Sequence, residues 1–243
     1  MDCLAIGAHA DDVELFAGGT VALACRLGRR VGIVDLTRGE MATRGTPEGR
    51  AEEARSAAAI LGIQVRETLD LGDGELANHN PNRRQLVEVI RRLRPRLILT
   101  HWREDRHPDH RRAHELARDA AFFSYVGEFP AAGERWEVEA LAYFLGNTLE
   151  PEPRVDWVVD IGAAIETKRA ATEAYKTQFF GDADEADDRK ATYISSRDFW
   201  EYFDRRSRLW GHLIDADHGE PFMLDRPAHA GHPLVELVGV GRE

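Results

Sequence analysis

The chain has few cysteines and no long apolar run. Its two cysteines, Cys3 and Cys25, lie in separate apolar stretches without a C-x-x-C pairing, which excludes a disulfide framework and predicts buried thiols. No run of about 20 apolar residues occurs that could form a transmembrane helix. The N-terminus also lacks a basic segment followed by an apolar one. We therefore expect a soluble protein of the reducing cytoplasm with no membrane partner.

Basic residues are also fewer than acidic ones. The 243 residues include 32 Lys and Arg against 43 Asp and Glu, a formal net charge of −11. This balance argues against the basic surface that non-specific nucleic-acid binding requires. The first predicted strand is not followed by G-x-G-x-x-G or G-x-x-x-x-G-K-[ST], and no G-x-S-x-G occurs. A nucleotide-binding module is the alternative from another functional class, but the missing motifs disfavour it, and a serine hydrolase is disfavoured as well.

The first half of the chain alternates short apolar strands with helices. Strands are predicted at 4–8, 31–36, 65–71 and 96–100, and helices at 20–27, 47–62, 83–93 and 110–125. The second half predicts strands at 141–145 and 157–161, helices at 163–179 and 196–214, an acidic loop at 181–190 and a polar turn at 218–222. This alternation is typical of a mostly parallel sheet flanked by helices. We predict one domain over 1–243, with a Rossmann-like α/β core at 1–126 and a C-terminal α+β elaboration at 127–243.

Polar residues that suit a metal site follow two of these strands. The stretch "HADDVE", residues 9–14, follows the first strand, and "EDRHPDH", residues 104–110, follows the fourth. In parallel sheets, ligands bind beyond the carboxyl ends of the strands, so both stretches are expected at one sheet edge. Each motif is weak by itself, but the two together favour a metal centre.

His9 and Asp12 are three positions apart where the chain turns from strand to helix, so an imidazole and a carboxylate converge as in many zinc sites. Asp11 projects differently and is placed to accept a proton from the attacking water. His110 is the preferred third ligand, because it can begin the next helix and point back at the strand ends. A rival assignment pairs His110 with His114, four positions further on, and the spacing leaves it open.

The remaining polar residues of the two stretches are expected to support this centre. His107 would be free to meet the oxyanion of the reaction as an imidazolium, with Asp109 holding its other nitrogen. His101 is expected to close its strand as a structural residue. Glu14 is expected to face solvent or to orient a ligand from behind.

The motifs "GAHADD" and "HPDH" resemble the LmbE-like family of zinc-dependent deacetylases, which includes the N-acetylglucosaminyl-phosphatidylinositol deacetylases. Further stretches, "VGIVDLTRGEMATRGTPEGRAEEA", "YKTQF" and "YISSRDFWEYFDRRSRLWGHLI", resemble the branch that acts on N-acetylglucosaminyl-malate in bacillithiol synthesis. The resemblance implies hydrolysis of an acetamide on a sugar, one Zn²⁺ per chain and a homotrimer or homohexamer. An amidase of thiol–sugar conjugates on the same scaffold is the alternative within enzymes.

The resemblance also implies roles for individual residues. It gives zinc ligands at His9, Asp12 and His110, a general base at Asp11, and an oxyanion contact at His107 with Asp109 behind it. An arginine of the family matches Arg50, which is expected near the carbonyl or the carboxylates of the substrate. Arg106, directly before H-P-D-H, is expected as a second anion contact.

One departure from the family pattern is Ala10, where the family usually has proline. Proline would lower the entropy of the unfolded loop, an effect of roughly 0.4–1 kcal/mol. Because alanine can adopt the same backbone angle and no ligand is lost, we expect a less rigid site that still functions.

Overall fold

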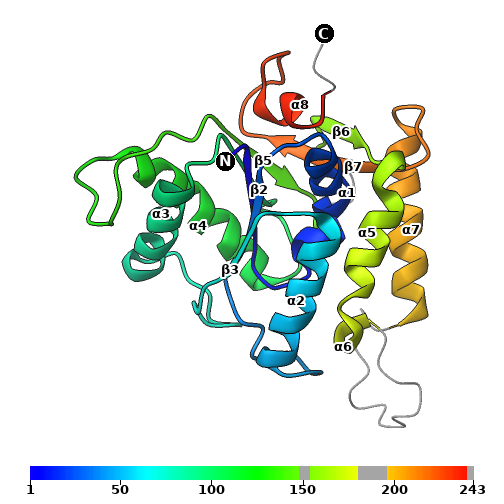
Figure 1. Ribbon diagram of the computed structural model, residues 1–243, viewed down its shortest axis with the longest axis horizontal. Helices are drawn as coiled ribbons and strands as arrows, with labels where there is room; N and C mark the ends of the chain where they lie inside the picture. Colours follow the sequence, from blue (N-terminus) through cyan, green and yellow to red (C-terminus); the bar gives the residue numbers. More distant parts are fainter. Residues whose placement is uncertain (148–153, 180–195, 240–243) are drawn as a thin grey trace.

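The computed structural model describes residues 1–147, 154–179 and 196–239, which form a seven-stranded sheet with helices on both faces (Figure 1). The strands are β1 (Cys3–Gly7), β2 (Val31–Asp35), β3 (Val65–Thr68), β4 (Leu97–His101), β5 (Ala140–Phe144), β6 (Trp157–Asp160) and β7 (Gly219–Leu224). Their order in the sheet is β3-β2-β1-β4-β5-β7-β6. Strands β1 to β5 are parallel to their neighbours, whereas β7 is antiparallel to both β5 and β6. The predicted mostly parallel α/β sheet is therefore confirmed.

The helices form two layers around this sheet. They are α1 (Asp12–Arg26), α2 (Pro47–Leu61), α3 (Asn80–Leu93), α4 (Pro108–Tyr125), α5 (Ile165–Glu173), α6 (Lys176–Phe179), α7 (Arg197–His212) and α8 (Pro233–Val238), with a 3₁₀ turn at Gly162–Ala164. Helices α3 and α4 lie on one side of the sheet, and α1, α2, α5 and α7 lie on the other (Figure 1). None of the helices in the described ranges is long and apolar enough to cross a membrane.

Strand β1 shows how the sheet is held between these layers. Its residues are all buried, and their side chains alternate between the two apolar cores, as the period of a strand requires. Cys3 and Ala5 belong to the core that includes α1, while Leu4 and Ile6 belong to the core that includes α3 and α4. Burial on both faces explains why the strand reads as a continuous apolar run.

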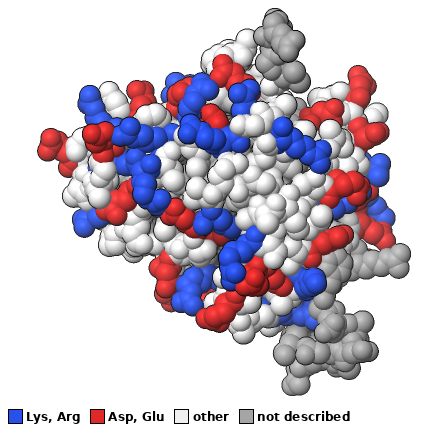
Figure 2. All heavy atoms as spheres, viewed as in Figure 1, with Lys and Arg blue, Asp and Glu red and all other residues white. Residues whose placement is uncertain are grey.

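Charged side chains of both signs are interspersed over the face that Figure 2 shows. Several arginines at the surface are paired with carboxylates, for example Arg92 with Glu67 at 2.6 Å and Arg96 with Glu139 at 2.7 Å. Such exposed pairs contribute little to stability.

The predicted helix at 47–62 is confirmed, and its ends show why. Thr46 caps the start of α2 by accepting a hydrogen bond from the Gly49 backbone N–H at 3.1 Å, and Pro47 occupies the first turn. Gly62 ends the helix in the left-handed conformation, with φ 77°.

The predicted start of the first helix was wrong. We expected it at Thr20, after a glycine pair, but α1 begins at Asp12 and contains both glycines. A Cβ atom on Gly19 would lie 2.7 Å from the Cβ of Ile161, so this glycine permits close packing. The backbone N–H groups of Gly19 and Thr20 also donate to the carboxylate of Glu220, at 2.9 and 2.7 Å.

The predicted polar turn at 218–222 was also wrong, because this segment enters β7 between β5 and β6. Its one carboxylate, Glu220, is buried and accepts hydrogen bonds from Lys168 at 2.6 Å and from the α1 backbone, so the strand can carry it inside. The predicted helix at 163–179 is divided into α5 and α6. The predicted acidic loop at 181–190 lies outside the described residues.

Replacing a glycine inside a helix by alanine usually stabilises a protein, but the close contact at Gly19 predicts the opposite there. Gly19→Ala should lower the free energy of unfolding by about 1–3 kcal/mol, because the new methyl group meets Ile161. Gly49→Ala is the control, since a Cβ there meets only the Thr46 hydroxyl at 3.4 Å and α2 should gain up to about 1 kcal/mol. Urea unfolding measures how far each variant changes the free energy of unfolding. An equal change in the two variants would contradict the close contact between Gly19 and Ile161.

Candidate metal centre

The two polar stretches meet beyond the carboxyl ends of the adjacent parallel strands β1 and β4. They line a pocket of about 370 Å³ together with the loop after β2 and part of α6. Of the predicted site residues, the pocket is lined by His9, Asp11, Asp12, Arg50, Arg106, His107 and His110. The remaining one, Asp109, lies behind them and is buried.

Asp12 lies near zinc-ligand spacing from the imidazoles of both His9 and His110. The three residues are divided between two groups of side chains that could hold a metal ion, His9 with His107 and His110, and Asp12 with His101 and His110. Asp12 lies between two imidazoles, with its Oδ1 3.1 Å from Nε2 of His110 and its Oδ2 3.5 Å from Nδ1 of His9. Ligand atoms on one tetrahedral zinc ion lie roughly 3.3–3.5 Å apart, given bond lengths near 2.1 Å. Two imidazoles and one carboxylate are also a ligand set that zinc commonly takes. The residues present therefore fit the predicted ion.

Carboxylates face the far nitrogen of each imidazole. Nε2 of His9 lies 3.1 Å from Asp73 Oδ1 and 3.4 Å from Asp109 Oδ2, and Nδ1 of His110 lies 3.1 Å from Asp105 Oδ2. A carboxylate in this place favours a proton on the nitrogen it faces, which leaves the opposite nitrogen free to bind a metal. Sequence reasoning missed Asp73 and Asp105, although Asp105 lies within the "EDRHPDH" stretch.

Asp109 does not take the expected position behind His107. Its carboxylate instead faces His9 and accepts the Gly74 backbone N–H at 2.7 Å. The reason is that His107 caps α4, so its Nδ1 accepts the backbone N–H of Asp109 at 3.2 Å. With Nδ1 as an acceptor, the proton of His107 lies on Nε2, and the geometry favours a neutral imidazole over the expected imidazolium. Desolvation also lowers the pKa of His107, as do the neighbouring imidazoles.

Two further histidines lie behind the pocket. His101 is fully buried, its Nε2 accepts the Ala8 backbone N–H at 3.1 Å, and its ring stacks on His110 with centroids 4.1 Å apart. His114 turns away, with Nδ1 2.9 Å from the His101 carbonyl oxygen and its ring against Tyr143. The structure therefore does not place His114 beside His110 at the candidate metal position, as the rival assignment requires.

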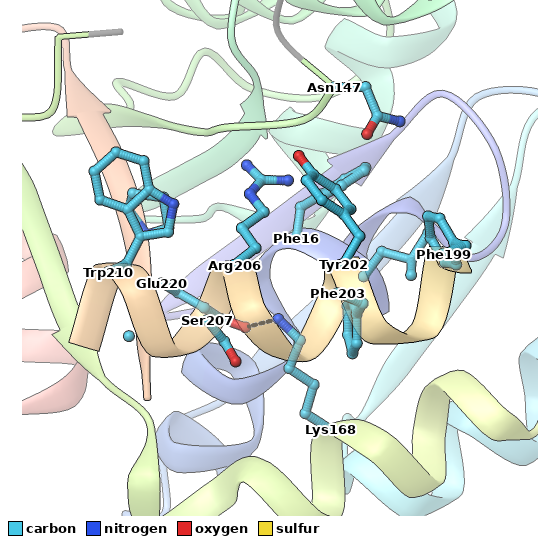
Figure 3. A pocket seen from close by; sticks show the side chains of 13 residues that line it. Phe16, Asn147, Lys168, Phe199, Tyr202, Phe203, Arg206, Ser207, Trp210 and Glu220 are labelled. Carbon is cyan, nitrogen blue, oxygen red and sulfur yellow. Dashed lines mark hydrogen bonds and ion pairs between the residues drawn. The ribbon is translucent and has the colours of Figure 1, made fainter. Parts of the chain in front are cut away.

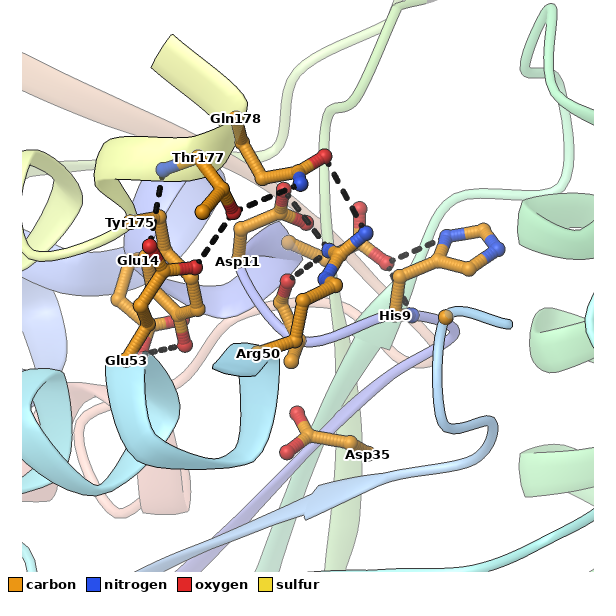
Figure 4. Close-up of polar contacts among 12 residues, drawn as sticks. His9, Asp11, Glu14, Asp35, Arg50, Glu53, Tyr175, Thr177 and Gln178 are labelled. Carbon is orange, nitrogen blue, oxygen red and sulfur yellow. Dashed lines mark hydrogen bonds and ion pairs between the residues drawn. The ribbon is translucent and has the colours of Figure 1, made fainter. Parts of the chain in front are cut away.

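Asp11 is buried beside the candidate ligands in a strained backbone conformation (Figure 4). Its φ is 125°, a region that residues other than glycine rarely adopt and that often marks functional sites. Arg50 holds this turn, because its Nη2 donates to the Ala10 carbonyl oxygen at 2.5 Å and lies 3.3 Å from Asp11 Oδ2. Burial raises the pKa of Asp11 to about 7, although Arg50 opposes the shift.

Both predicted substrate-binding arginines line the pocket, in different surroundings. Arg50 is buried, and its Nη1 donates to Gln178 Oε1 at 3.3 Å, so its guanidinium is largely engaged by the protein. Arg106 is exposed at the pocket wall, and its backbone N–H donates to the Asn147 carbonyl oxygen at 2.9 Å. Their contacts with a substrate stay predictions.

Glu14 does not face solvent as expected. It is fully buried, 2.5 Å from Arg66 Nη1, and accepts the Tyr175 hydroxyl at 3.0 Å. Arg66 also pairs with Asp35 at 2.8 Å. Glu14 thus joins a buried ionic network that ties α1 to β2, β3 and the segment after α5, away from the candidate ligands.

Comparison with known proteins agrees with the placement of these motifs. Residues 4–121 match the family model "PIG-L: GlcNAc-PI de-N-acetylase". Diacetylchitobiose deacetylase of Thermococcus kodakarensis is 32% identical over 194 residues, which cover 72% of this chain and 69% of that protein. The 4-oxalmesaconate hydratase of Pseudomonas putida is 30% identical over 191 residues, or 72% and 73% of the two chains.

A solved structure resembles almost the whole chain. The conserved protein TT1542 from Thermus thermophilus superimposes with a TM-score of 0.84 at 36% identity, covering 94% of this chain and 96% of that one. The agreement therefore extends beyond residues 4–121 into the C-terminal half. Taken with the matched motifs, these similarities show that the chain belongs to the PIG-L (LmbE-like) family, described as GlcNAc-PI de-N-acetylase.

Proposed function

We propose that this protein is a zinc-dependent hydrolase that removes the acetyl group from an N-acetylglucosamine conjugate. The observation that carries the proposal is the buried Asp11 carboxylate beside Asp12, whose two oxygens lie 3.1 and 3.5 Å from the imidazoles of His110 and His9. The relatives support the substrate class. Besides the diacetylchitobiose deacetylase, a 1D-myo-inositol 2-acetamido-2-deoxy-alpha-D-glucopyranoside deacetylase of Rhodococcus jostii is 28% identical over 236 residues.

In this proposal His9, Asp12 and His110 hold the zinc ion. When bound there, zinc supplies a Lewis acid and lowers the pKa of water toward 7. Asp11 takes the proton from the attacking water and then delivers it to the departing amine. Arg50 keeps the Asp11 carboxylate in position through its contacts with Asp11 and the preceding carbonyl oxygen.

His107 acts on the other side of the reacting carbonyl. Because its Nδ1 accepts a backbone N–H, its Nε2–H is available to donate to the oxyanion that forms when water attacks. A neutral donor suffices for this role, although it stabilises the oxyanion less than an imidazolium would. The pocket of about 370 Å³ has room for a sugar residue.

N-acetylglucosaminyl-malate is the specific substrate that we propose. The resemblance of "YKTQF" and of the α7 sequence to the bacillithiol branch supports this choice, and Gln178 of "YKTQF" lines the pocket. Exposed Arg106 would contact the malate carboxylates. An amidase of thiol–sugar conjugates is the alternative on the same scaffold. The homotrimer or homohexamer and the cytoplasmic location stay predictions.

A second candidate reaction is the addition of water to a carbon–carbon double bond. The similarity to 4-oxalmesaconate hydratase favours it, because that protein is 30% identical over 191 residues. A metal and a carboxylate base that activate water serve either reaction. The two differ in their products, since only the hydrolase releases acetate.

Acetate release is the direct test of the proposed function. The zinc-loaded protein is incubated with N-acetylglucosaminyl-malate, diacetylchitobiose and 4-oxalmesaconate, and acetate and hydration are measured with and without a chelator. We expect acetate from the amino sugars, its loss on chelation and its return with zinc. Hydration without acetate release, or acetate release indifferent to chelator, would overturn the proposal.

Removing the base should separate metal binding from chemistry. Asp11→Asn should bind zinc normally but release acetate roughly 100- to 10,000-fold more slowly, because no carboxylate takes the proton. Asp70→Asn is the matched control, since Asp70 is exposed, pairs with Arg38 and does not line the pocket. If Asp11→Asn works at the parent rate, the assignment of the base is wrong.

The two candidate histidines of α4 can be told apart by metal content. His110→Ala should lose zinc on dialysis, whereas His114→Ala should keep about one ion per chain, because its ring faces Tyr143. Atomic emission on the dialysed proteins gives the ratio. Loss of zinc from both variants would restore the rival assignment, and retention of zinc by His110→Ala would contradict His110 as a ligand.

A further inference from the structure

Helix α7 carries an arginine within an otherwise aromatic face. Phe199, Phe203 and Trp210 lie at helical spacing along this face, and Arg206 lies between them. All four line a small cavity between α7, α1 and β7 (Figure 3). A guanidinium among aromatic rings is costly to desolvate unless polar groups or an anion accompany it.

Among the described residues, Arg206 forms no ion pair, and the Asp105 and Glu220 carboxylates act on it only from a longer distance. Its Nη2 donates to the Leu145 carbonyl oxygen, and its guanidinium carbon lies 5.4 Å from the ring centroid of Phe16. The second cation of the cavity, Lys168, already pairs with Glu220 at 2.6 Å. The described residues that line the cavity therefore include two cations and one carboxylate.

This cavity adjoins the candidate metal centre. Four residues line both the cavity and the larger pocket: Leu15, Phe16, Asn147 and Phe199. The ring of Phe16 meets the His110 ring edge to face at a centroid distance of 6.4 Å and also lies 5.4 Å from the guanidinium carbon of Arg206. Arg206 is thus one aromatic ring away from a predicted zinc ligand.

The space beside Arg206 is too small for a sugar ring. Its volume is about 20 Å³, enough for one or two water-sized groups. The two oxygens of a carboxylate match this size, and a guanidinium binds a carboxylate through paired hydrogen bonds.

We infer that Arg206 forms a carboxylate-binding subsite of the catalytic pocket. The inference rests on the proposed function for the origin of the carboxylate. Two sources share this chemistry: a carboxylate on the aglycone of the amino-sugar substrate, and the acetate that hydrolysis releases. Arg206 would then be a residue that determines substrate preference or product retention.

The first arm of the test compares two substrates. For N-acetylglucosaminyl-malate and the neutral methyl glycoside of N-acetylglucosamine, kcat/KM is measured on the wild type, Arg206→Gln, Arg206→Lys and Arg208→Gln. Loss of a charge-assisted contact should lower the anionic-to-neutral ratio about tenfold or more in Arg206→Gln, with partial recovery in Arg206→Lys. Arg208 is the matched control, because it is exposed on the same helix and pairs with Asp204 at 2.7 Å.

The second arm measures acetate binding to the same zinc-loaded proteins by titration calorimetry. It does not depend on turnover, so it tests the subsite even if the proposed function fails. Acetate affinity should fall about tenfold in Arg206→Gln and stay unchanged in Arg208→Gln. If Arg206→Gln does not fold, two other measurements take its place. One is acetate affinity and the substrate ratio in Arg206→Lys, and the other is the decline of the wild-type anionic-to-neutral kcat/KM ratio as salt is raised.

The outcomes distinguish a substrate carboxylate from acetate as the bound group, and they test the Arg206 subsite separately from the proposed function. An Arg206-dependent substrate ratio assigns the subsite to the substrate, and Arg206-dependent acetate binding without that ratio assigns it to the product. If neither quantity depends on Arg206, the inference is overturned. If the wild type releases no acetate from either glycoside, the proposed function fails, and acetate binding alone decides the subsite.

Discussion

A single buried carboxylate, Asp12, sets the charge that the rest of the site must balance. Its Oδ2 accepts the His9 backbone N–H at 2.7 Å, and its two oxygens lie within 3.2 Å of the imidazoles of His101 and His110. Although burial opposes it, these imidazoles hold the pKa of Asp12 well below its usual range, so the group is ionised. Conversely, burial lowers the pKa of His110, but Asp12 and Asp105 raise it to about 9. The centre therefore requires positive charge, which a proton or a divalent cation can provide.

The fold brings these groups together through the adjacency of β1 and β4, which are far apart in sequence but paired in the sheet. The strained turn at Asp11 places the Asp12 carboxylate at the candidate metal position and the Asp11 carboxylate beside it, and the proposed reaction uses Asp11 to transfer protons. The same machinery for activating water suits both deacetylase and hydratase relatives. Residues outside this centre, such as those lining the cavity beside α7, must therefore determine which molecule reacts.

Much of the fold and the clustering of the site residues could be predicted from the sequence. Apolar runs buried on both faces identify parallel strands, and parallel strands place their carboxyl ends at one edge. The start of α1 could not be predicted, because Gly19 serves a contact with Ile161, which is distant in the sequence. The contacts of Asp73 and Asp105 with the imidazoles were missed for a related reason. The partner of Asp73 depends on how loops from different strands meet, and its sequence carries no local signal of that meeting. Asp105 lies within the "EDRHPDH" stretch, but the sequence does not show which imidazole it faces.

The position of the metal tests the central claim most directly. A crystal of the zinc-loaded protein, measured on both sides of the zinc absorption edge, would locate the ion by its anomalous signal. The account predicts one strong peak within bonding distance, about 2.0–2.2 Å, of His9 Nδ1, an oxygen of Asp12 and His110 Nε2. A peak among His9, Asp73 and Asp109, which also lie close enough to hold a metal ion, would contradict it.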